Sequence, residues 1–463
     1  MTKENTAAEP GDKLDFKRIL PIFVIVLVDL LGLTIIIPLL PLYATTYGAN
    51  PFVIGLLGAA YPAMQFVGAP LLGRLSDRHG RKPILIISQI GTLVGFVMLG
   101  FATTLWMLFL SRIIDGISGA NIATAQAAIS DSTNEKTRTQ GLGLIGAAFG
   151  LGFIVGPVIA FVSLEISDQN YHVPAFVAAF FSLFSILLTT FWFKETLPAE
   201  QRDEEQKRAS FSFRSLVSAV SHPAVGLLLV LIFAQQLAFG GFEQLLALFT
   251  LSRLGLNASG NAIVFVYVGI IVVVVQGGLI GRWSRRFGDR RLIYGGLTLL
   301  AIGLLAVGLT LRQPPPWYSE AALEAELTTS EALPGETPPA EDLQVELPDD
   351  SNNGWLGLIW LAVAMIPVAI GGGILQPAIN SLITKRVDIA DIGGMLGISA
   401  AFLSAANALA PVIGGALFQT IGPGAPFLFW SLLLVLLLVI AVRYLRPGRE
   451  ETAPNGLARG GGH

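Results

Sequence analysis

The sequence predicts an all-α integral membrane protein with about twelve transmembrane helices in two pseudo-symmetric six-helix bundles. Three observations predict this fold class. Of the 463 residues, 53% are hydrophobic and only 13% are charged, whereas about a quarter of the residues in an average soluble domain are charged. About twelve apolar runs have the length of a bilayer-crossing helix, and two stretches of the first half are echoed in the second half.

The apolar runs are each about 18–25 residues long. They lie near residues 19–43, 52–72, 84–102, 105–128, 140–162, 174–193, 223–248, 261–280, 292–311, 355–377, 392–416 and 425–445. The first run is too long and too continuous for a cleavable signal segment, and no small-residue cleavage site follows it, so we expect it to remain as a helix. An even number of spans places both termini on the same side of the membrane.

Lys and Arg residues are concentrated in alternate loops between these runs. If the N-terminus is cytoplasmic, 26 of the 29 Lys and Arg residues fall in cytoplasmic segments, and only Arg112, Arg253 and Arg312 remain for the spans and the opposite face. Short cytoplasmic loops carry the excess of Lys and Arg in membrane proteins. We therefore expect a multi-pass protein of the inner or plasma membrane with both termini in the cytoplasm.

A hydrophilic stretch of mixed charge follows the sixth run and divides the runs into six and six. We therefore expect a first bundle at residues 1–194, a cytoplasmic linker at 195–222, a second bundle at 223–446 and a cytoplasmic tail at 447–463.

A second hydrophilic stretch, residues 313–354, separates the ninth and tenth runs and holds ten acids, seven prolines and no Lys or Arg. Low hydrophobicity combined with like charge predicts disorder, or at most a short amphipathic helix around residues 319–328. On the external face this stretch is either a tolerated loop insertion or a lid or cation-collecting loop.

Two internal echoes support the division into related halves. The segment GRLSDRHGRKP at residues 73–83 has a counterpart, GRWSRRFGDRR, at 281–291 in the equivalent loop of the second half. The stretch at 142–160 is echoed at 396–414, with Pro157 opposite Pro411.

The first of these segments resembles the signature of the major facilitator superfamily between its second and third spans, G-x-L-x-D-R-x-G-R-K. The matching residues are Gly73, Leu75, Asp77, Arg78, Gly80, Arg81 and Lys82. The fourth run contains Arg112-Ile-Ile-Asp-Gly116, similar to the family's R-x-x-x-G element. The resemblance covers essentially the whole chain and implies two parallel six-helix bundles that transport a small molecule.

The fifth run contains Gly152, Gly156 and Pro157, similar to the family's antiporter element G-x-x-x-G-P, which implies close helix packing there. The usual continuation x-x-G-G is missing after Pro157, and Pro411 with the Gly414-Gly415 pair supplies the fuller version in the second half. Within the family, the chain most resembles bacterial drug–proton exporters of the tetracycline-efflux type. Those exporters carry an acid in span nine and residues 292–311 carry none, so tetracycline is not implied as the substrate.

Asp77 is an acid in a basic loop, able to accept from Arg81 or to face the positive N-terminal end of a helix in the other half. The resemblance implies a conformational latch on the cytoplasmic side of the outward-facing form, made by Gly73, Asp77, Arg78, Gly80, Arg81 and Lys82. Asp131, at the end of the fourth run, is a further candidate partner of the arginines. In the second-half copy Arg285 replaces the acid, which predicts an asymmetric latch. The alternative is that the basic residues only hold the loop in the cytoplasm.

Four charged residues inside the spans are candidates for proton coupling or for contact with the substrate. They are Asp29, Arg112, Asp115 and Glu243. A charge near the middle of the bilayer costs roughly 2.5–3.5 kcal/mol on insertion scales, so such residues normally face a bundle interior or a wet cavity.

Each of these residues also has a structural interpretation. Arg112 and Asp115 are three residues apart, so they can neutralise each other on one helix face. Glu243 shares a face with Gln236 and Gly240 but lies late in its span, where it could reach the external interface. Asp29 has no partner in its own run and is the preferred proton carrier unless another helix supplies its partner.

Polar residues in the spans mostly form hydrogen bonds between helices, and some are expected to line a substrate cavity. The candidates are Asn121, Gln126, Gln235, Gln236, Gln376 and Asn380, with Gln65 and Asn407 as further hydrogen-bonding residues.

The sequence contains no phosphate-binding loop, catalytic triad or metal-ligand spacing, and it has no cysteine. We therefore expect no enzymatic activity, no cofactor, no metal and no nucleic-acid partner. The partners expected are a small-molecule substrate, protons and the lipid bilayer. The leading hypothesis is a secondary active transporter that exports small amphipathic or drug-like molecules in exchange for protons. A proton-coupled symporter of a sugar or metabolite and a non-transporting membrane scaffold are the alternatives.

Overall fold

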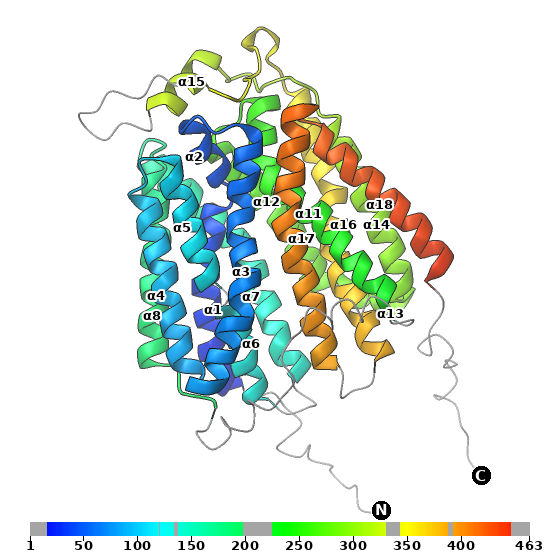
Figure 1. Cartoon of the computed structure of the whole chain (residues 1–463). Helices are drawn as coiled ribbons and strands as arrows, with labels where there is room; N and C mark the ends of the chain where they lie inside the picture. Colours follow the sequence, from blue (N-terminus) through cyan, green and yellow to red (C-terminus); the bar gives the residue numbers. More distant parts are fainter. Residues whose placement is uncertain are drawn as a thin grey trace, which may run out of the picture.

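A computed structural model describes residues 16–119, 121–133, 138–197, 225–329, 343–387 and 392–445. All regular elements in this part of the chain are helices, which confirms the predicted all-α class. Eleven segments are long and apolar enough to cross a membrane by length and composition. The helices form two six-helix halves that stand side by side (Figure 1), and their boundaries in the chain stay a prediction because most of the linker and all of the tail lie outside the described residues.

The described part of the first half contains eight helices, of which α2, α5 and α6 are short pieces of longer predicted runs. They are α1 (Phe16–Ile36), α2 (Leu40–Thr46), α3 (Pro51–His79), α4 (Arg81–Gly100), α5 (Leu105–Ser118), α6 (Asn121–Asp131), α7 (Arg138–Ile166) and α8 (His172–Phe191). The predicted run 105–128 is divided into α5 and α6, each too short to count among the eleven spans. The predicted run 19–43 also breaks, because Pro38 and Pro41 lack the backbone N–H groups that would continue α1.

The second half follows the same order with longer helices. They are α11 (Gly226–Leu254), α12 (Ala258–Val274), α13 (Ile280–Phe287), α14 (Asp289–Gly308), α16 (Leu356–Arg386), α17 (Ile392–Thr420) and α18 (Ala425–Tyr444). A π-helical turn at Val275–Leu279 joins α12 to α13. The first residues of α1 and the last residues of α18 lie at the same end of the bundle (Figure 1), as the even number of spans predicts.

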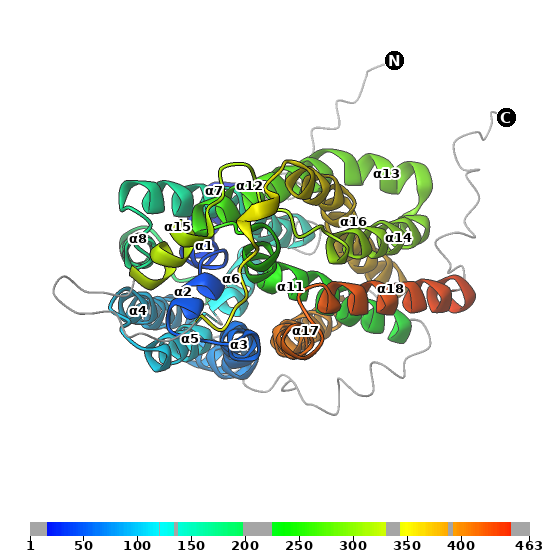
Figure 2. The ribbon, with the colours of Figure 1, turned by 90° about the horizontal axis from the view of Figure 1, so that it is seen from above.

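The two ends of the bundle differ in composition. We call the end that carries α2 and the short helix α15 (Glu320–Thr329) the capped end, and the opposite end, with Arg81 and Lys385, the basic end. Figure 2 shows α3 beside α17 and α7 beside α12, and these pairs join the two halves.

The halves approach most closely near the capped end. A Cβ on Gly55 of α3 would lie 3.1 Å from the Cα of Gly415 in α17, so the two backbones meet directly. The amide of Phe52 donates to Gln419 Oε1 at 3.1 Å, again from α3 to α17. On the other seam, Gln169 Nε2 donates to Ser259 Oγ at 2.8 Å.

Part of the acidic stretch at 313–354 is packed against the protein, whereas an unpacked insertion was expected. The predicted short helix around 319–328 is confirmed as α15, but its Leu323 and Leu327 are only 6% and 0% exposed. Tyr318, 8% exposed, covers Gly255, where φ is +62° and a Cβ would overlap the tyrosine ring. The Tyr318 hydroxyl donates to the Pro348 carbonyl at 2.8 Å. Residues 318–329 and 343–353 therefore form an ordered cap.

The cap contacts both halves of the bundle. Its helix α15 packs on α2 of the first half, above the end of α1 (Figure 1). Asn257, in the turn between α11 and α12, donates to Glu326 Oε2 at 3.1 Å. Burial raises the pKa of the Glu326 carboxyl, and the nearby Glu165 carboxylate adds to this, against the opposing effect of Asn257. Because docking of the cap raises the pKa of Glu326, protonation of this residue favours the docked cap. Lowering the pH should therefore stabilise the contact between the cap and the bundle.

Leu327→Ala tests whether the cap contributes to stability. Loss of a fully buried leucine costs about 2–5 kcal/mol in well-packed sites, so we expect a clear fall in the melting temperature of the purified protein. Glu324→Ala, on the exposed side of the same helix, should leave it unchanged. Equal melting temperatures for Leu327→Ala and the unmodified protein would contradict the packed cap.

Candidate functional site

A buried ion pair lies in the first half. Arg112 Nη1 is 3.1 Å from Asp115 Oδ2, and both side chains are 2% exposed. The two residues are on one face of α5, as their spacing predicted. Gly95 of α4 makes room for the pair, because a Cβ there would lie 2.9 Å from the Cβ of Asp115. The guanidinium carbon also lies 5.4 Å from the centre of the Phe96 ring, within the range of a cation–π contact.

The ion pair does not use all the donors of the arginine. Arg112 Nε and Nη2 have no hydrogen-bond partner among the described residues. A buried polar group without a partner usually marks bound water or a group that changes partners during function. The pair is therefore a candidate for more than structural neutralisation.

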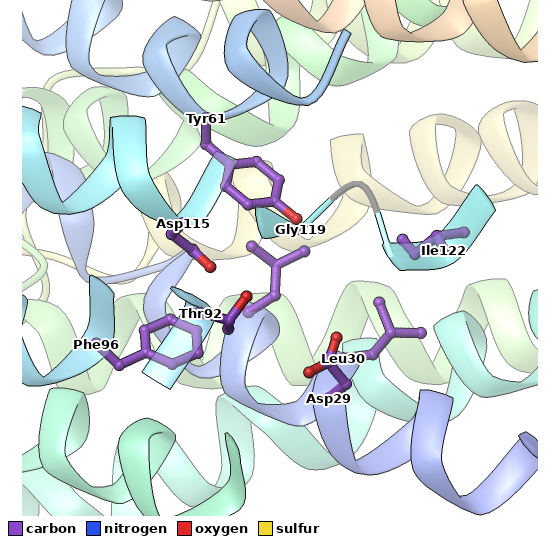
Figure 3. A pocket seen from close by; sticks show the side chains of 9 residues that line it. Asp29, Leu30, Tyr61, Thr92, Phe96, Asp115, Gly119 and Ile122 are labelled. Carbon is purple, nitrogen blue, oxygen red and sulfur yellow. The ribbon is translucent and has the colours of Figure 1, made fainter. Parts of the chain in front are cut away.

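A small cavity next to the pair brings Asp29 and Asp115 to one place. It has a volume of about 10 Å³, room for about one water molecule. The lining residues are Asp29, Leu30, Leu33, Tyr61, Thr92, Phe96, Asp115, Gly119 and Ile122. Figure 3 shows the carboxyl groups of Asp29 and Asp115 and the hydroxyls of Tyr61 and Thr92 turned toward this common space. Five helices or helix ends contribute to it, from α1 to α6.

A second cavity of the same size, about 10 Å³, shares Asp29, Leu30 and Ile122 with the first and extends toward Gln89 of α4. Asp29 therefore stands between two spaces that can each hold about one water molecule. Sequence reasoning missed Tyr61 and Gln89 here, since neither an aromatic residue nor an amide in an apolar run signals which face it occupies.

The polar residues of the second half lie in α11, α16 and α17. Gln236 Nε2 donates to Asn407 Oδ1 at 2.8 Å, and Ser399 Oγ donates to Asn380 Oδ1 at 3.1 Å. Gln376 and Glu243 are half-buried. The described residues provide no hydrogen bond or ion pair to Glu243, which lies eleven residues before the end of α11.

The remaining cavity candidates are placed differently. Gln235 is 1% exposed and belongs to the packed interior of the second half. Gln126 is exposed on α6, and the side chain of Asn121 lies outside the described residues. Gln65 Nε2 donates to the Gly119 carbonyl at 3.0 Å, bridging α3 to the break between α5 and α6.

The glycine pair of α7 packs against α1. A Cβ on Gly156 would lie 2.7 Å from the Cβ of Thr34, and one on Gly152 would lie 3.6 Å from Leu30. Pro157 is accommodated inside α7. This segment thus allows close contact with the helix that carries Asp29.

The signature loop at 73–83 lies at the basic end, and its charged residues form ion pairs within the first half. Arg81, 2% exposed, pairs with Asp77, and its Nε is 2.9 Å from Asp131 Oδ2. Gly80 turns the chain with φ of +101°, a conformation that favours glycine. Gly73 has open space around it, and Arg78 is exposed. The contacts that the described residues provide to Asp77 lie inside the first half, so a contact to the second half is not formed in this arrangement.

An unexpected residue completes this loop. Glu195, just after α8, accepts from the backbone N–H groups of Arg81 and Lys82 at 2.8 and 3.1 Å. A carboxylate at a helix N-terminus satisfies free donors and complements the helix dipole. Lys82 Nζ in turn donates to the Thr190 carbonyl at 2.7 Å, so the end of α8 is tied to the start of α4.

The second-half copy of the loop contains an ion pair at the same place, but the acidic and basic residues are exchanged. Asp289, 6% exposed, occupies the position of Arg81, and Lys385 at the end of α16 corresponds to Asp131 at the end of α6. Lys385 Nζ is 2.5 Å from Asp289 Oδ2. Ser381 Oγ also donates to Asp289, at 2.7 Å. The predicted asymmetry thus has a specific form, because the acid absent at Arg285 is present four residues later.

Comparisons with known proteins agree with this architecture. The profile of the Major Facilitator Superfamily matches residues 22–323 and 354–462. The tetracycline resistance protein, class D, of Salmonella ordonez is 29% identical over 434 residues, covering 92% of this chain and 96% of that protein. Multidrug resistance protein 1 of Bacillus subtilis (strain 168) is 26% identical over 424 residues, covering 91% and 95%.

Solved structures share the fold at low sequence identity. The human organic anion transporter MFSD10 (TETRAN) has a TM-score of 0.63 and 21% identity, covering 92% of this chain and 99% of that chain. The nucleoside transporter NupG has a TM-score of 0.64 and 12% identity, covering 93% and 99%.

Exchanging the charges of Asp289 and Lys385 tests whether this ion pair stabilises the protein. Asp289→Lys should destabilise the protein, because it sets a second cation beside Lys385 in a site where losing the buried acid alone costs about 1–3 kcal/mol. Adding Lys385→Asp should recover a substantial part of the loss in thermal unfolding. Arg285→Ala, an exposed change in the same loop, is the control. If the double variant lost as much stability as the two single variants together, the two residues would not stabilise each other.

Proposed function

The chain belongs to the Major Facilitator Superfamily, and from this membership and its buried acids we propose that it is a secondary active transporter that exports small amphipathic or drug-like molecules in exchange for protons. The relatives named as tetracycline and multidrug resistance proteins support the export of drug-like cargo. The class D protein and multidrug resistance protein 1 are 29% and 26% identical to this chain, and the particular cargo does not follow from their names.

The observation that carries the proposal is the meeting of Asp29, Asp115 and Arg112 around water-sized cavities. Asp29 and Asp115 line one cavity, and Arg112 pairs with Asp115 beside it, in a region where a charge is costly. Protonation of one of the two carboxyl groups removes one negative charge from this region, and its loss restores that charge. A group of this composition is suited to exchange a proton when the access to it changes.

The orientation of the bundle follows from its charges. We assign the basic end to the cytoplasm, since Lys and Arg concentrate on that side of membrane proteins. The contacts between α3 and α17 at Gly55 and Gly415 then lie on the external side. In this arrangement the protein is held together on the outside, and export requires that this seam open while the basic end closes.

The signature loop is the proposed latch for the opposite arrangement. Asp77, whose side chain is 35% exposed, pairs here with Arg81 of its own half. When the basic end closes, Asp77 comes within reach of the second half and the helix ends there favour its negative charge. Arg81 and Asp131 keep the loop ordered in both arrangements.

Flux in proteoliposomes tests the proposed function. An imposed pH gradient should drive amphipathic compounds against their own gradient while protons move in the opposite direction, measured with a pH-sensitive dye. Proton movement in the same direction as the cargo would establish symport. Absence of flux for a broad panel of amphipathic compounds and metabolites would favour a scaffold.

Asp29→Asn should abolish uphill, proton-driven export and retain substrate binding. The amide keeps the size and the hydrogen bonding of the side chain but cannot exchange a proton. Binding and gradient-driven flux are measured on the same liposome preparation, with the exposed external change Asp350→Asn as the control. Undiminished uphill flux would exclude Asp29 as the essential carrier and transfer that role to Asp115.

Asp77→Asn should preserve expression and folding while reducing the transport rate severalfold, because the loop retains its cations but loses the acid that stabilises the alternate arrangement. The readout is flux per folded molecule. Arg74→Gln, at an exposed position of the same loop that is not part of the proposed latch, controls for a general change in charge. Equal transport by Asp77→Asn and the unmodified protein would remove the latch.

A further inference from the structure

The side-chain amide of Gln89 has a fixed orientation. Gln89 lies on α4 and is 0% exposed. Its Nε2 donates to Ser185 Oγ of α8 at 2.7 Å, and Ser185 Oγ donates to the Ile25 carbonyl of α1 at 3.4 Å. A serine hydroxyl has a single hydrogen to donate, so Ser185 can only accept from Gln89. The hydrogen-bond network therefore assigns the nitrogen of the amide to the side of Ser185 and leaves the oxygen on the opposite side.

The second cavity, beside Asp29, offers this amide oxygen a partner. Gln89 Oε1 is buried and has no hydrogen-bond partner among the described residues. The cavity is lined by Gln89, Asp29 and six apolar residues, and its volume of about 10 Å³ has room for about one water molecule. Buried polar atoms are normally paired with a protein group or with an ordered water. A water molecule in this cavity can pair with both the amide oxygen and the carboxyl group.

The two cavities follow each other along the axis of the first half. The first cavity touches α1 at Leu33, and the second touches α1 at Ile25, about two turns earlier. On α4 the first cavity extends to Phe96 and the second to Leu85. Both helices begin at the basic end (Figure 1), so the second cavity lies nearer to that end. Asp29 lines both cavities and stands between them.

Apolar side chains close the second cavity toward the basic end. Ile19, Ile22 and Ile129 are 0%, 2% and 0% exposed, and they belong to one buried cluster with the apolar residues of the cavity. A charge crosses such a layer only at high cost. The cluster therefore separates the second cavity from the basic end, whereas the first cavity joins Asp29 to Asp115.

We propose that Gln89 is a positioning residue for proton exchange, because it fixes a water molecule that hydrogen bonds to the carboxyl group of Asp29 in both of its protonation states. The proposal rests on the export function proposed above and deepens its proton site. When Asp29 carries the proton, its O–H donates to the water oxygen, and the water donates to Gln89 Oε1. When the proton has left by way of the first cavity, the second O–H of the same water donates to the carboxylate.

The positioned water acts on the cost of proton release. On this side the Asp29 carboxylate otherwise faces the six apolar residues of the cavity, where a charge without a hydrogen bond is costly. Hydrogen bonds to a charged acceptor are stronger than those between neutral groups. The water therefore favours release of the proton, while the apolar cluster excludes bulk water from the acid.

Transport by Gln89→Met tests the proposal. Methionine keeps the length of the side chain and removes the amide oxygen. Proton-driven export in proteoliposomes should fall roughly tenfold, the expected effect of losing one hydrogen bond to a charged group. Exchange of labelled for unlabelled cargo across the membrane needs no proton release and should stay nearly unchanged. Ile87→Met, at an exposed position of the same helix, is the matched control.

Infrared difference spectroscopy observes the water in the unmodified full-length protein. Because the water changes from accepting to donating when Asp29 loses its proton, its O–H stretching frequency should differ between acidic and alkaline samples. Water labelled with heavy oxygen should shift this band. The band should be absent from Asp29→Asn and Gln89→Met and present in Ile87→Met. A spectrum without the band in the unmodified protein, or the same band in Gln89→Met, would overturn the proposal.

The outcomes separate this inference from the proposed function. Proton-driven export by the unmodified protein, without a water band that depends on Gln89, would refute the water site and leave the export function standing. A water band that depends on Gln89 and Asp29, without proton-driven flux of any compound, would refute export and keep the water site. Equal losses of proton-driven export and cargo exchange in Gln89→Met would show a packing role and overturn the positioning role.

Discussion

The energetic cost of a charge among hydrocarbon determines how this chain arranges nearly everything polar in its spans. Arg112 and Asp115 are fully buried and adjacent, and Gly95 leaves the space that the pair needs. Asp289 is satisfied by Lys385 and two serines. Asp29 lines two water-sized cavities, and Glu243 lies half-buried on α11 without an ion pair to any described residue. We therefore expect function at buried acids that line cavities or have no ion pair with a described residue.

The two halves share an architecture but differ in their chemistry. Gly80 and Gly288 both turn the chain with a positive φ, and the following residue in each is buried and ion-paired. In the first half that residue is a cation and in the second an anion. The two ion pairs thus occupy equivalent places in the two halves, although the positions of the acid and the base are exchanged. The acids of the proposed proton site, Asp29 and Asp115, both belong to the first half.

The sequence predicted the features that depend on neighbours along the chain. Apolar length located the spans, and three-residue spacing placed Arg112 beside Asp115. The meeting of Asp29 with Asp115 could not be predicted, because it depends on how α1 is rotated toward α5. Glu195 capping α4 could not be foreseen either, since more than a hundred residues separate the partners. The sealing of the cap by Leu323 and Leu327 was hidden by the acidic composition around them.

The cap affects how long the protein dwells with its external side closed. Opening that side separates α2 from α11, and α15 touches α2 while its Glu326 accepts from Asn257 of the second half. Each leucine that this separation exposes to water costs about 1.5–3 kcal/mol, and every 1.4 kcal/mol changes a population about tenfold. Exposing one such side chain thus makes the externally open state roughly ten- to a hundredfold rarer. The cap therefore biases the protein toward the arrangement in which the capped end is closed.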